Sequence, residues 1–249
     1  MFSSLHQKGN PVILFNIWDA GTAKIAENSG AKVIALGSHA VAEAYGYEDG
    51  ENIPLDLALE NATRIVSSTE LPVTLDFEAG YGSTPSEVRE SVTRALQTGI
   101  IGVNIEDKKS GGDGLYTIDE QVERIKAVRE AAQDFGVDLF INARTDLFKE
   151  ADPADHNDKL VNMALKRAAA FANAGADGFF APVIIRKEHM KRICDESPLP
   201  VNIIWLPGMG MPDVDEVNKL NVSRISYGPG PWLQMKEWLA EKASSAYRS

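Results

Sequence analysis

The chain has 249 residues, of which 44% are hydrophobic and 24% are charged, which is typical of a globular chain with a substantial core. Its net charge of −11 at pH 7 argues against binding to nucleic acid or to an anionic membrane surface, because both need clustered Lys and Arg. A single cysteine, Cys194, excludes an internal disulfide; together with the lack of a signal-like or membrane-spanning apolar run, it predicts a cytoplasmic protein.

Short apolar runs alternate with amphipathic segments along the whole chain. Eight runs have the length of β-strands, at residues 12–15, 31–36, 72–77, 100–105, 137–141, 178–181, 201–205 and 224–227. Helical patterns occupy 20–29, 54–68, 85–98, 118–135, 159–174, 187–196 and 213–220. Eight strands alternating with helices predict a parallel (β/α)8 TIM barrel of the α/β class, as one domain over residues 1–249. A doubly wound open sheet is the alternative.

The third apolar run ends in two carboxylates and is followed by glycines. Asp76 and Glu78 stand two residues apart, so a strand would point both side chains to the same side. Two hard oxygen donors at a strand end are suited to Mg²⁺, and Gly80 and Gly82 would keep side chains out of a ligand's way. A simply solvated pair of acids is the alternative reading.

Polar residues also follow the other predicted strands. They include Trp18, the triplet Gly37, Ser38 and His39, the acid Glu106, the base Arg144, and Asn202 within the seventh run. Active sites of TIM barrels lie at the carboxyl ends of the strands, so these side chains are expected to converge there. For Arg144, a buried ion pair with Asp146 or Glu106 is the alternative to a role in binding substrate.

Six segments occur in an order that resembles one enzyme superfamily. They are NIWDA at 16–20, GS at 37–38 with YGYEDG at 45–50, DFEAGYG at 76–82, GVNIED at 102–107, NARTD at 142–146 and RISYGP at 224–229. The chain thereby resembles the isocitrate lyase/phosphoenolpyruvate mutase superfamily over nearly its whole length. The resemblance implies a Mg²⁺-dependent enzyme, with Mn²⁺ as a possible substitute, that handles small 2-oxo carboxylates through an enolate-like intermediate.

The resemblance also implies roles for individual residues. Asp49, Asp76, Glu78 and Glu106 match the acids grouped around the metal, several of which act through bound water. Arg144 matches the arginine that holds the substrate carboxylate, and Ser38 matches the turn that holds an anion. We place Gly37, His39, Trp18 and Asn202 in the same expected substrate-binding set, with Trp18 as a wall of the pocket.

The loop at residues 108–116 departs from the superfamily pattern. The lyase branches carry a catalytic cysteine there, whereas this loop reads KKSGGDGLY and has neither Cys nor His. Isocitrate or methylisocitrate cleavage is therefore disfavoured. The asparagine-containing segment of the phosphonomutase branch is also missing. Lys108, Ser110 and Tyr116 are the candidate proton donors, and the glycines suit a loop that closes over substrate.

The hypothesis is C–C cleavage or decarboxylation of a 2-oxo carboxylate such as oxaloacetate. The alternative enzyme is one of P–C bond chemistry on phosphonopyruvate or phosphoenolpyruvate, as a mutase or hydrolase. A binding protein that has lost the chemistry and kept the site is the alternative of another class.

Residues 231–246 carry Trp232, Leu233, Met235, Trp238 and Leu239 at helical spacing, which is too apolar for a free tail. We expect a final helix that packs on the barrel or on a neighbouring subunit. Superfamily members often exchange this helix, so a homo-oligomer, either dimer or tetramer, is predicted. His6, His156 and His189 are expected at the surface, and Cys194 is expected to be a structural thiol.

Overall fold

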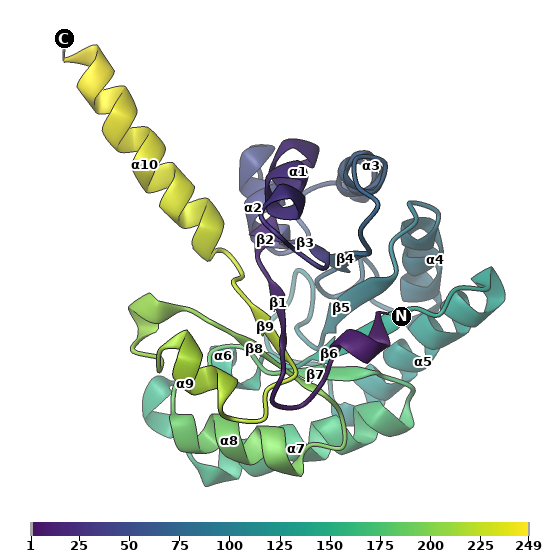
Figure 1. Ribbon diagram of the computed structural model, residues 1–249. Helices are drawn as coiled ribbons and strands as arrows, with labels where there is room; N and C mark the ends of the chain where they lie inside the picture. Colours follow the sequence, from purple (N-terminus) through teal and green to yellow (C-terminus); the bar gives the residue numbers. More distant parts are fainter. Residues whose placement is uncertain (1, 249) are drawn as a thin grey trace.

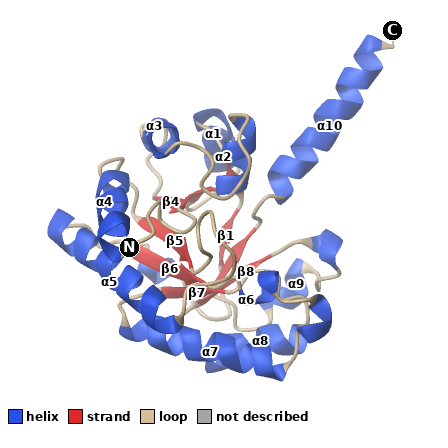
Figure 2. Ribbon diagram, turned by 180° about the vertical axis from the view of Figure 1, so that it is seen from behind, coloured by secondary structure: helices blue, strands red, loops and turns tan. Residues whose placement is uncertain are grey.

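Nine parallel strands form a nearly closed barrel with helices around it in the computed structural model, which describes residues 2–248 (Figures 1 and 2). The strands are β1 (Val12–Leu14), β2 (Asn16–Ile17), β3 (Ile34–Leu36), β4 (Val73–Asp76), β5 (Gly102–Glu106), β6 (Phe140–Arg144), β7 (Gly178–Phe180), β8 (Val201–Ile204) and β9 (Arg224–Ser226). Their order in the sheet is β1-β9-β8-β7-β6-β5-β4-β3-β2. The predicted (β/α)8 type of barrel is confirmed.

The ninth strand arises because the first predicted run divides in two. β1 pairs with β9 and β2 pairs with β3, so the two short strands lie on either side of the barrel's closure. Phe15 separates them and is 49% exposed. The chain changes its hydrogen-bonding neighbour at this residue, which a run of four apolar side chains does not reveal.

Ten α-helices lie outside the strands in the described part of the chain. They are α1 (Ala20–Asn28), α2 (Ser38–Ala44), α3 (Leu55–Val66), α4 (Pro85–Leu96), α5 (Ile118–Phe135), α6 (Leu147–Glu150), α7 (Asp158–Asn173), α8 (Lys187–Glu196), α9 (Val214–Asn218) and α10 (Gly230–Tyr247). Short 3-10 turns are found at Ser3–Leu5, Pro153–Asp155 and Pro207–Met209. The short helices α2 and α6 were not predicted, because four to seven residues carry too little periodicity to be recognised.

The fifth predicted strand is displaced along the chain. The expectation was 137–141, whereas β6 covers Phe140–Arg144. Gly136 ends α5 in the left-handed region at φ +77°, and the N–H of Val137 then donates to Ala132. This helix-terminating turn delays the strand by three residues and makes Arg144 its last residue.

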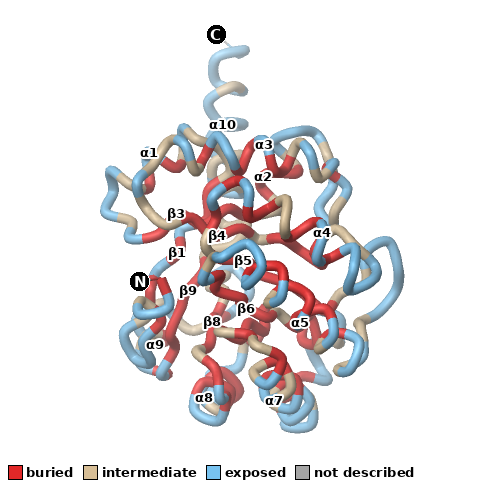
Figure 3. The backbone as a smooth tube through the Cα atoms, turned by 90° about the vertical axis from the view of Figure 1, so that its right-hand side faces the viewer, coloured by how far each residue is buried: buried red, intermediate tan, exposed pale blue. Residues whose placement is uncertain are grey.

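The apolar faces of the helices pack on the outside of the strands, and Figure 3 shows these inward faces buried. Val88 and Val92 of α4, Ile125 of α5 and Phe171 of α7 are fully buried in one cluster with the strand residue Ile105. α4 and α5 pack against one another along the outside of the barrel, next to β4 and β6. The strands that carry the predicted acids are therefore backed by fully buried side chains.

The interior of the barrel is polar, unlike the branched apolar filling common in TIM barrels. Its buried members are Thr74, Asn104, Asn142, Asn202, Arg224 and Ser226. Below them, His6 stacks on Phe140 with ring centroids 4.0 Å apart, and Phe2 contacts both rings edge-on. His6, His156 and His189 are all buried, so the prediction that they lie at the surface was wrong.

The last helix, α10, extends away from the barrel in Figures 1 and 2. Of its residues only Pro231 is buried, while Leu233, Trp238 and Leu239 are 41%, 58% and 53% exposed. Most of the helix therefore does not pack on its own barrel. Packing of α10 on a neighbouring subunit stays a prediction. Within residues 2–248 no helix is both long enough and apolar enough to cross a membrane.

Candidate active site at the carboxyl ends of the strands

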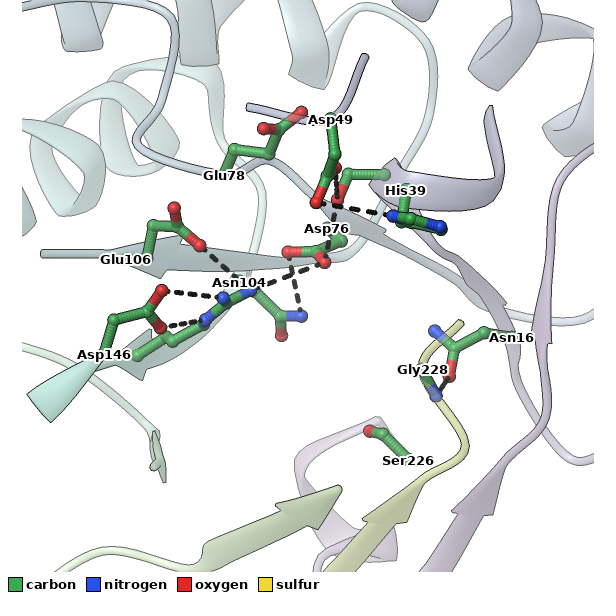
Figure 4. A network of polar contacts seen from close by, with 12 residues as sticks. Asn16, His39, Asp49, Asp76, Glu78, Asn104, Glu106, Asp146, Ser226 and Gly228 are labelled. Atoms are coloured by element: carbon green, nitrogen blue, oxygen red, sulfur yellow. Dashed lines mark hydrogen bonds and ion pairs between the residues drawn. The ribbon is translucent and has the colours of Figure 1, made fainter. Parts of the chain in front are cut away.

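Three adjacent strands, β4 to β6, end in Asp76, Glu106 and Arg144. The register pairs Asp76 with Asn104 and Glu106 with Arg144, so the parallel alignment itself brings these residues to one level. Glu106 and Arg144 line a cavity of about 470 Å³ together with Ser38, Asp49 and Glu78. Figure 4 shows the carboxylates of Asp49, Asp76, Glu78 and Glu106 grouped at this opening.

Glu78 reaches the cavity for a different reason from the one predicted. β4 ends at Asp76, and Glu78 lies beyond it in the left-handed region at φ +51°, so strand alternation does not set its direction. Its Oε2 accepts the N–H of Glu51 at 2.7 Å, which ties it to the chain before α3. Gly82 is also explained by the fold, because a Cβ there would lie 2.7 Å from the backbone nitrogen of Val88 in α4.

The four acids create a strongly unfavourable concentration of negative charge. Burial raises the pKa of Glu78 to about 9, and the carboxylates of Asp49, Asp76 and Glu106 add to that effect. Burial also raises the pKa of Glu106, despite the opposing guanidinium of Arg144. A divalent cation among these oxygens would relieve the repulsion, so the donor set fits Mg²⁺.

The arrangement of the four acids fits a Mg²⁺ site in which water supplies part of the coordination. In residues 2–248 no three His, Cys, Asp or Glu side chains stand close enough together to enclose an ion directly. Mg²⁺ commonly keeps several of its waters and binds through one or two carboxylates, so this spacing suits that mode.

The guanidinium of Arg144 is bound by carboxylates of the protein itself. Its Nε and Nη2 donate to the two oxygens of Asp146 at 2.6 and 2.9 Å, and its Nη1 lies 2.9 Å from Oε2 of Glu106. Asp76 is further away, at 3.8 Å from Nη1. Burial opposes the charge of Arg144, but these carboxylates hold its pKa well above the usual value. The predicted alternative of a buried ion pair is therefore present, and only the outer Nη1 and Nη2 hydrogens remain for a substrate.

Ser38 is the first residue of α2 and contacts two of the acids. Its hydroxyl lies 3.2 Å from Oδ2 of Asp76 and 3.3 Å from Oδ1 of Asp49. His39 follows, with Nδ1 3.7 Å from Asp49 and Nε2 3.5 Å from Glu43. The N–H of Gly37 donates to Ile17 at 3.1 Å, so this group serves the sheet and is not available to an anion.

Gly37, His39 and Asp76 line a smaller cavity beside this one, and three other predicted site residues line neither of the two. Trp18 packs edge-on against Trp232 of α10, with ring centroids 5.0 Å apart, and lines an apolar groove on the outside of the barrel. Asn202 is enclosed in the barrel interior, where its Oδ1 accepts the Ser226 hydroxyl. The Tyr116 hydroxyl contacts the carbonyl of Ser83 at 3.4 Å and does not line the cavity. The structure thus gives none of these three predictions support.

The other two loop residues do line the cavity. Lys108 and Ser110 stand on its rim, in a turn closed by the N–H of Lys109 donating to Gly114 at 3.2 Å. The Lys108 ammonium forms an ion pair with Glu150 of α6, and this hydrogen bond raises its pKa. Lys108 therefore stays protonated at neutral pH, which is the state that a proton donor needs.

Sequence reasoning missed several residues of the site. Lys149, on the four-residue helix α6, lines this cavity and a second one of about 240 Å³ beside it, and no periodicity could have revealed it. Asn16 lines the second cavity, where its Oδ1 accepts the N–H of Gly228 at 2.8 Å. Asn104 donates to Asp76 at 3.3 Å. Both asparagines stand in the quoted segments, so a signal for them was present.

Comparison with known proteins decides the family. Residues 2–247 match the family model described as phosphoenolpyruvate phosphomutase. The chain belongs to this family. The predicted resemblance to the isocitrate lyase/phosphoenolpyruvate mutase superfamily is thereby confirmed, and with it the expectation of an enzyme, since the family consists of lyases and mutases.

Three relatives show the range of the family. A solved structure from Burkholderia cenocepacia J2315, provisionally described as a phosphonomutase, is 42% identical, covers 98% of this chain and 96% of its own, and superimposes with a TM-score of 0.95. The 2-methylisocitrate lyase of Escherichia coli is 27% identical over 91% of this chain and 76% of its own length. The oxaloacetate decarboxylase of Pseudomonas fluorescens is 27% identical over 88% and 74%, respectively.

Proposed function

We propose that this family member is a Mg²⁺-dependent lyase that cleaves a C–C bond of a small 2-oxo carboxylate, or decarboxylates it, with oxaloacetate as the model substrate. The observation that carries the proposal is the meeting of Asp76, Glu106 and Arg144 at adjacent strand ends, beside a cavity of about 470 Å³. The 2-methylisocitrate lyase and oxaloacetate decarboxylase relatives are named for reactions of this class.

Asp76 would hold the cation, with Asp49, Glu78 and Glu106 arranged around it and partly acting through water. When bound, the ion supplies a Lewis acid that favours the enolate form of the substrate's keto group. Mn²⁺ has similar oxygen-ligand preferences and could substitute.

Side chains of the protein then bind the substrate, shield it from water and donate a proton to it. The free hydrogens of Nη1 and Nη2 in Arg144 orient the C1 carboxylate, beside the turn that begins with Ser38. For oxaloacetate, the electrons of the C3–C4 bond pass into the enolate as CO₂ leaves. Lys108 or Ser110, on the loop at the cavity rim, gives a proton to C3 and completes pyruvate. Closure of that loop keeps bulk water away from the enolate.

P–C bond chemistry on phosphonopyruvate is the second candidate. The 42% identity to the Burkholderia structure described as a phosphonomutase favours it. Lys108, Lys109 and Lys149 also line the 470 Å³ cavity, and three ammonium groups suit a phosphonate better than a departing neutral CO₂.

Release of product, which is pyruvate from oxaloacetate and either pyruvate or phosphoenolpyruvate from phosphonopyruvate, tests the function when measured with Mg²⁺ and then with EDTA. Oxaloacetate loses CO₂ slowly without enzyme, so the signal is the rate above that of an enzyme-free blank with the same Mg²⁺ or EDTA. Asp56→Ala, which removes an 83% exposed acid on α3, is the matched control and should behave as wild type. We expect chelator-sensitive release from one substrate and loss of at least about 100-fold in Asp76→Ala. No enzyme-dependent release from either substrate would contradict both candidates.

A further inference from the structure

A buried arginine inside the barrel has no part in the site as described so far. Arg224 begins β9, is 2% exposed, and extends across the interior to β5, where its Nη2 lies 3.2 Å from Oδ1 of Asn104. Its Nε lies 3.4 Å from the Ser226 hydroxyl, and its Nη1 has no partner. Within residues 2–248 no carboxylate lies within ion-pair distance of this guanidinium.

An isolated buried cation is costly for the fold. Burial lowers the pKa of Arg224 to about 9, although the charge of Asp76, which lies beyond ion-pair distance, raises it, so Arg224 remains charged at neutral pH without a direct ion-pair partner. Branched apolar side chains fill this layer in ordinary TIM barrels at no such cost. We expect the cost of burying this arginine to be offset by a function of its contact with Asn104.

That contact determines which way the Asn104 amide faces. Its Oδ1 accepts from Arg224 and also from Nδ2 of Asn142, at 2.9 Å. Asn142 has room to stand there because its neighbour on β7 is Gly178, where a Cβ would lie 2.7 Å from Oδ1 of Asn142. With both donors on one side, the Nδ2 end of Asn104 must face the other side.

The Nδ2 end of Asn104 faces Asp76. It donates to Oδ1 of that carboxylate at 3.3 Å (Figure 4), while Oδ2 accepts the Ser38 hydroxyl at 3.2 Å. The Asp76 carboxylate is thus bound at both oxygens. One of the two hydrogen bonds depends, through Asn104, on Arg224 of β9. Flipping the Asn104 amide would instead turn a carbonyl oxygen toward Asp76, which would repel it.

We propose that Arg224 is a positioning residue, which locks the amide of Asn104 so that Asn104 aims the Asp76 carboxylate at the cation site. The inference rests on the proposed function, because it gives Asp76 the role of cation ligand. Arg224 acts through geometry, since its charge by itself would weaken the binding of a cation above it. Positioning by Arg224 should strengthen cation binding and its charge should weaken it, so an experiment can separate the two effects.

The proposal is tested by measuring the binding of Mn²⁺ to the whole chain, without substrate, by electron paramagnetic resonance. Arg224→Met removes the charge and the contact; Arg224→Lys keeps the charge but cannot reach both Ser226 and Asn104. We expect both variants to weaken Mn²⁺ binding about 10- to 100-fold, as loss of a group that orients a ligand does. Tighter binding in Arg224→Met with wild-type binding in Arg224→Lys would show a mere charge effect and overturn the proposal, as would unchanged affinity in both.

Further variants separate positioning from a loss of stability. Asn104→Leu breaks the link while leaving Arg224 in place, and should cause the same loss; adding Arg224→Met to it should cause no more. Additive losses would overturn the proposal, and unchanged Mn²⁺ affinity in Asn104→Leu would overturn it even if the arginine variants do not fold. Arg129→Met is the matched control, since this half-buried arginine bonds Gly175 and Asp177 away from the site. Its loss should leave Mn²⁺ affinity unchanged.

The proposed function fails separately from this inference. If wild-type protein binds Mn²⁺ and Asp76→Ala does not, the site stands, and unchanged Arg224 variants would overturn the positioning role alone. If wild-type protein does not bind Mn²⁺, the cation site and the inference are both overturned.

Discussion

Nη1 of Arg144 lies 2.9 Å from Oε2 of Glu106, across the pair formed by the last residues of β5 and β6. Nε and Nη2 of the same guanidinium each donate one hydrogen bond to Asp146, which is fully buried. One arginine therefore balances two buried acids beside the cavity. It serves the stability of the strand ends as well as the binding of a substrate.

Replacing Arg144 by methionine is expected to destabilise the protein by about 3–5 kcal/mol, because Asp146 would keep its charge in a buried place without its partner. The double variant Arg144→Met/Asp146→Leu should recover part of this loss, since only Glu106 then remains buried without its partner. Urea unfolding of the wild type and the two variants measures it. Equal losses in the single Arg144 variant and the double variant would contradict the expectation.

The candidate proton donors of the loop should differ sharply. Lys108→Met is expected to lower kcat by at least about 100-fold with little change in KM, because Lys108 lines the cavity and remains protonated. Tyr116→Phe should stay within a few-fold of wild type, since the Tyr116 hydroxyl contacts Ser83 outside the cavity. Steady-state kinetics on the accepted substrate distinguish the two. A large effect of Tyr116→Phe would show that the loop rearranges during turnover.

His6 should make folding sensitive to acid. Burial, helped by the charge of Arg224, lowers the pKa of His6 from 6.5 to about 3, so the folded protein holds the ring neutral. The unfolded chain takes up the proton below pH 6.5; this group's contribution to stability is therefore present above pH 6.5 and is lost as the pH falls toward 3. The slope is about 1.4 kcal/mol per pH unit within that window.

His6→Phe keeps an aromatic ring beside Phe140 without the titration. Urea unfolding between pH 6.5 and 4 should show a shallower decline for this variant than for wild type. Equal slopes in the two proteins would mean that His6 is not held neutral.

The exposed face of α10 is expected to be covered in solution. Trp238→Glu combined with Leu239→Glu should dissociate a dimer or tetramer, because both side chains are more than half exposed on a helix that leaves the barrel. Light scattering coupled to size-exclusion chromatography gives the mass. Ser244→Glu, a charge added further along the same helix, is the control. A wild-type monomer at micromolar concentration would contradict the predicted homo-oligomer.

The barrel and the position of its site could be read from local patterns. Apolar runs of strand length, separated by helical periods, determine a parallel barrel, and such a barrel places Asp76, Glu106 and Arg144 at one end whatever their contacts. The segments that resemble the superfamily supplied the rest of the predicted site. Displacing β6 by three residues changed none of this, because the residues after the run still stand at the strand's carboxyl end.

The direction and surroundings of individual side chains were decided by tertiary structure. Glu78 faces the cavity because of a left-handed backbone turn, and Trp18 faces outward because α10 supplies Trp232. His6 is buried because the chain's first residues close the barrel beneath Phe140. The sequence by itself determined which residues come to the mouth, since hydrophobic periodicity is a local property. Only the packing of residues far apart in the chain decided which of them face the cavity, since neighbours such as Arg224 and Asn104 are 120 residues apart.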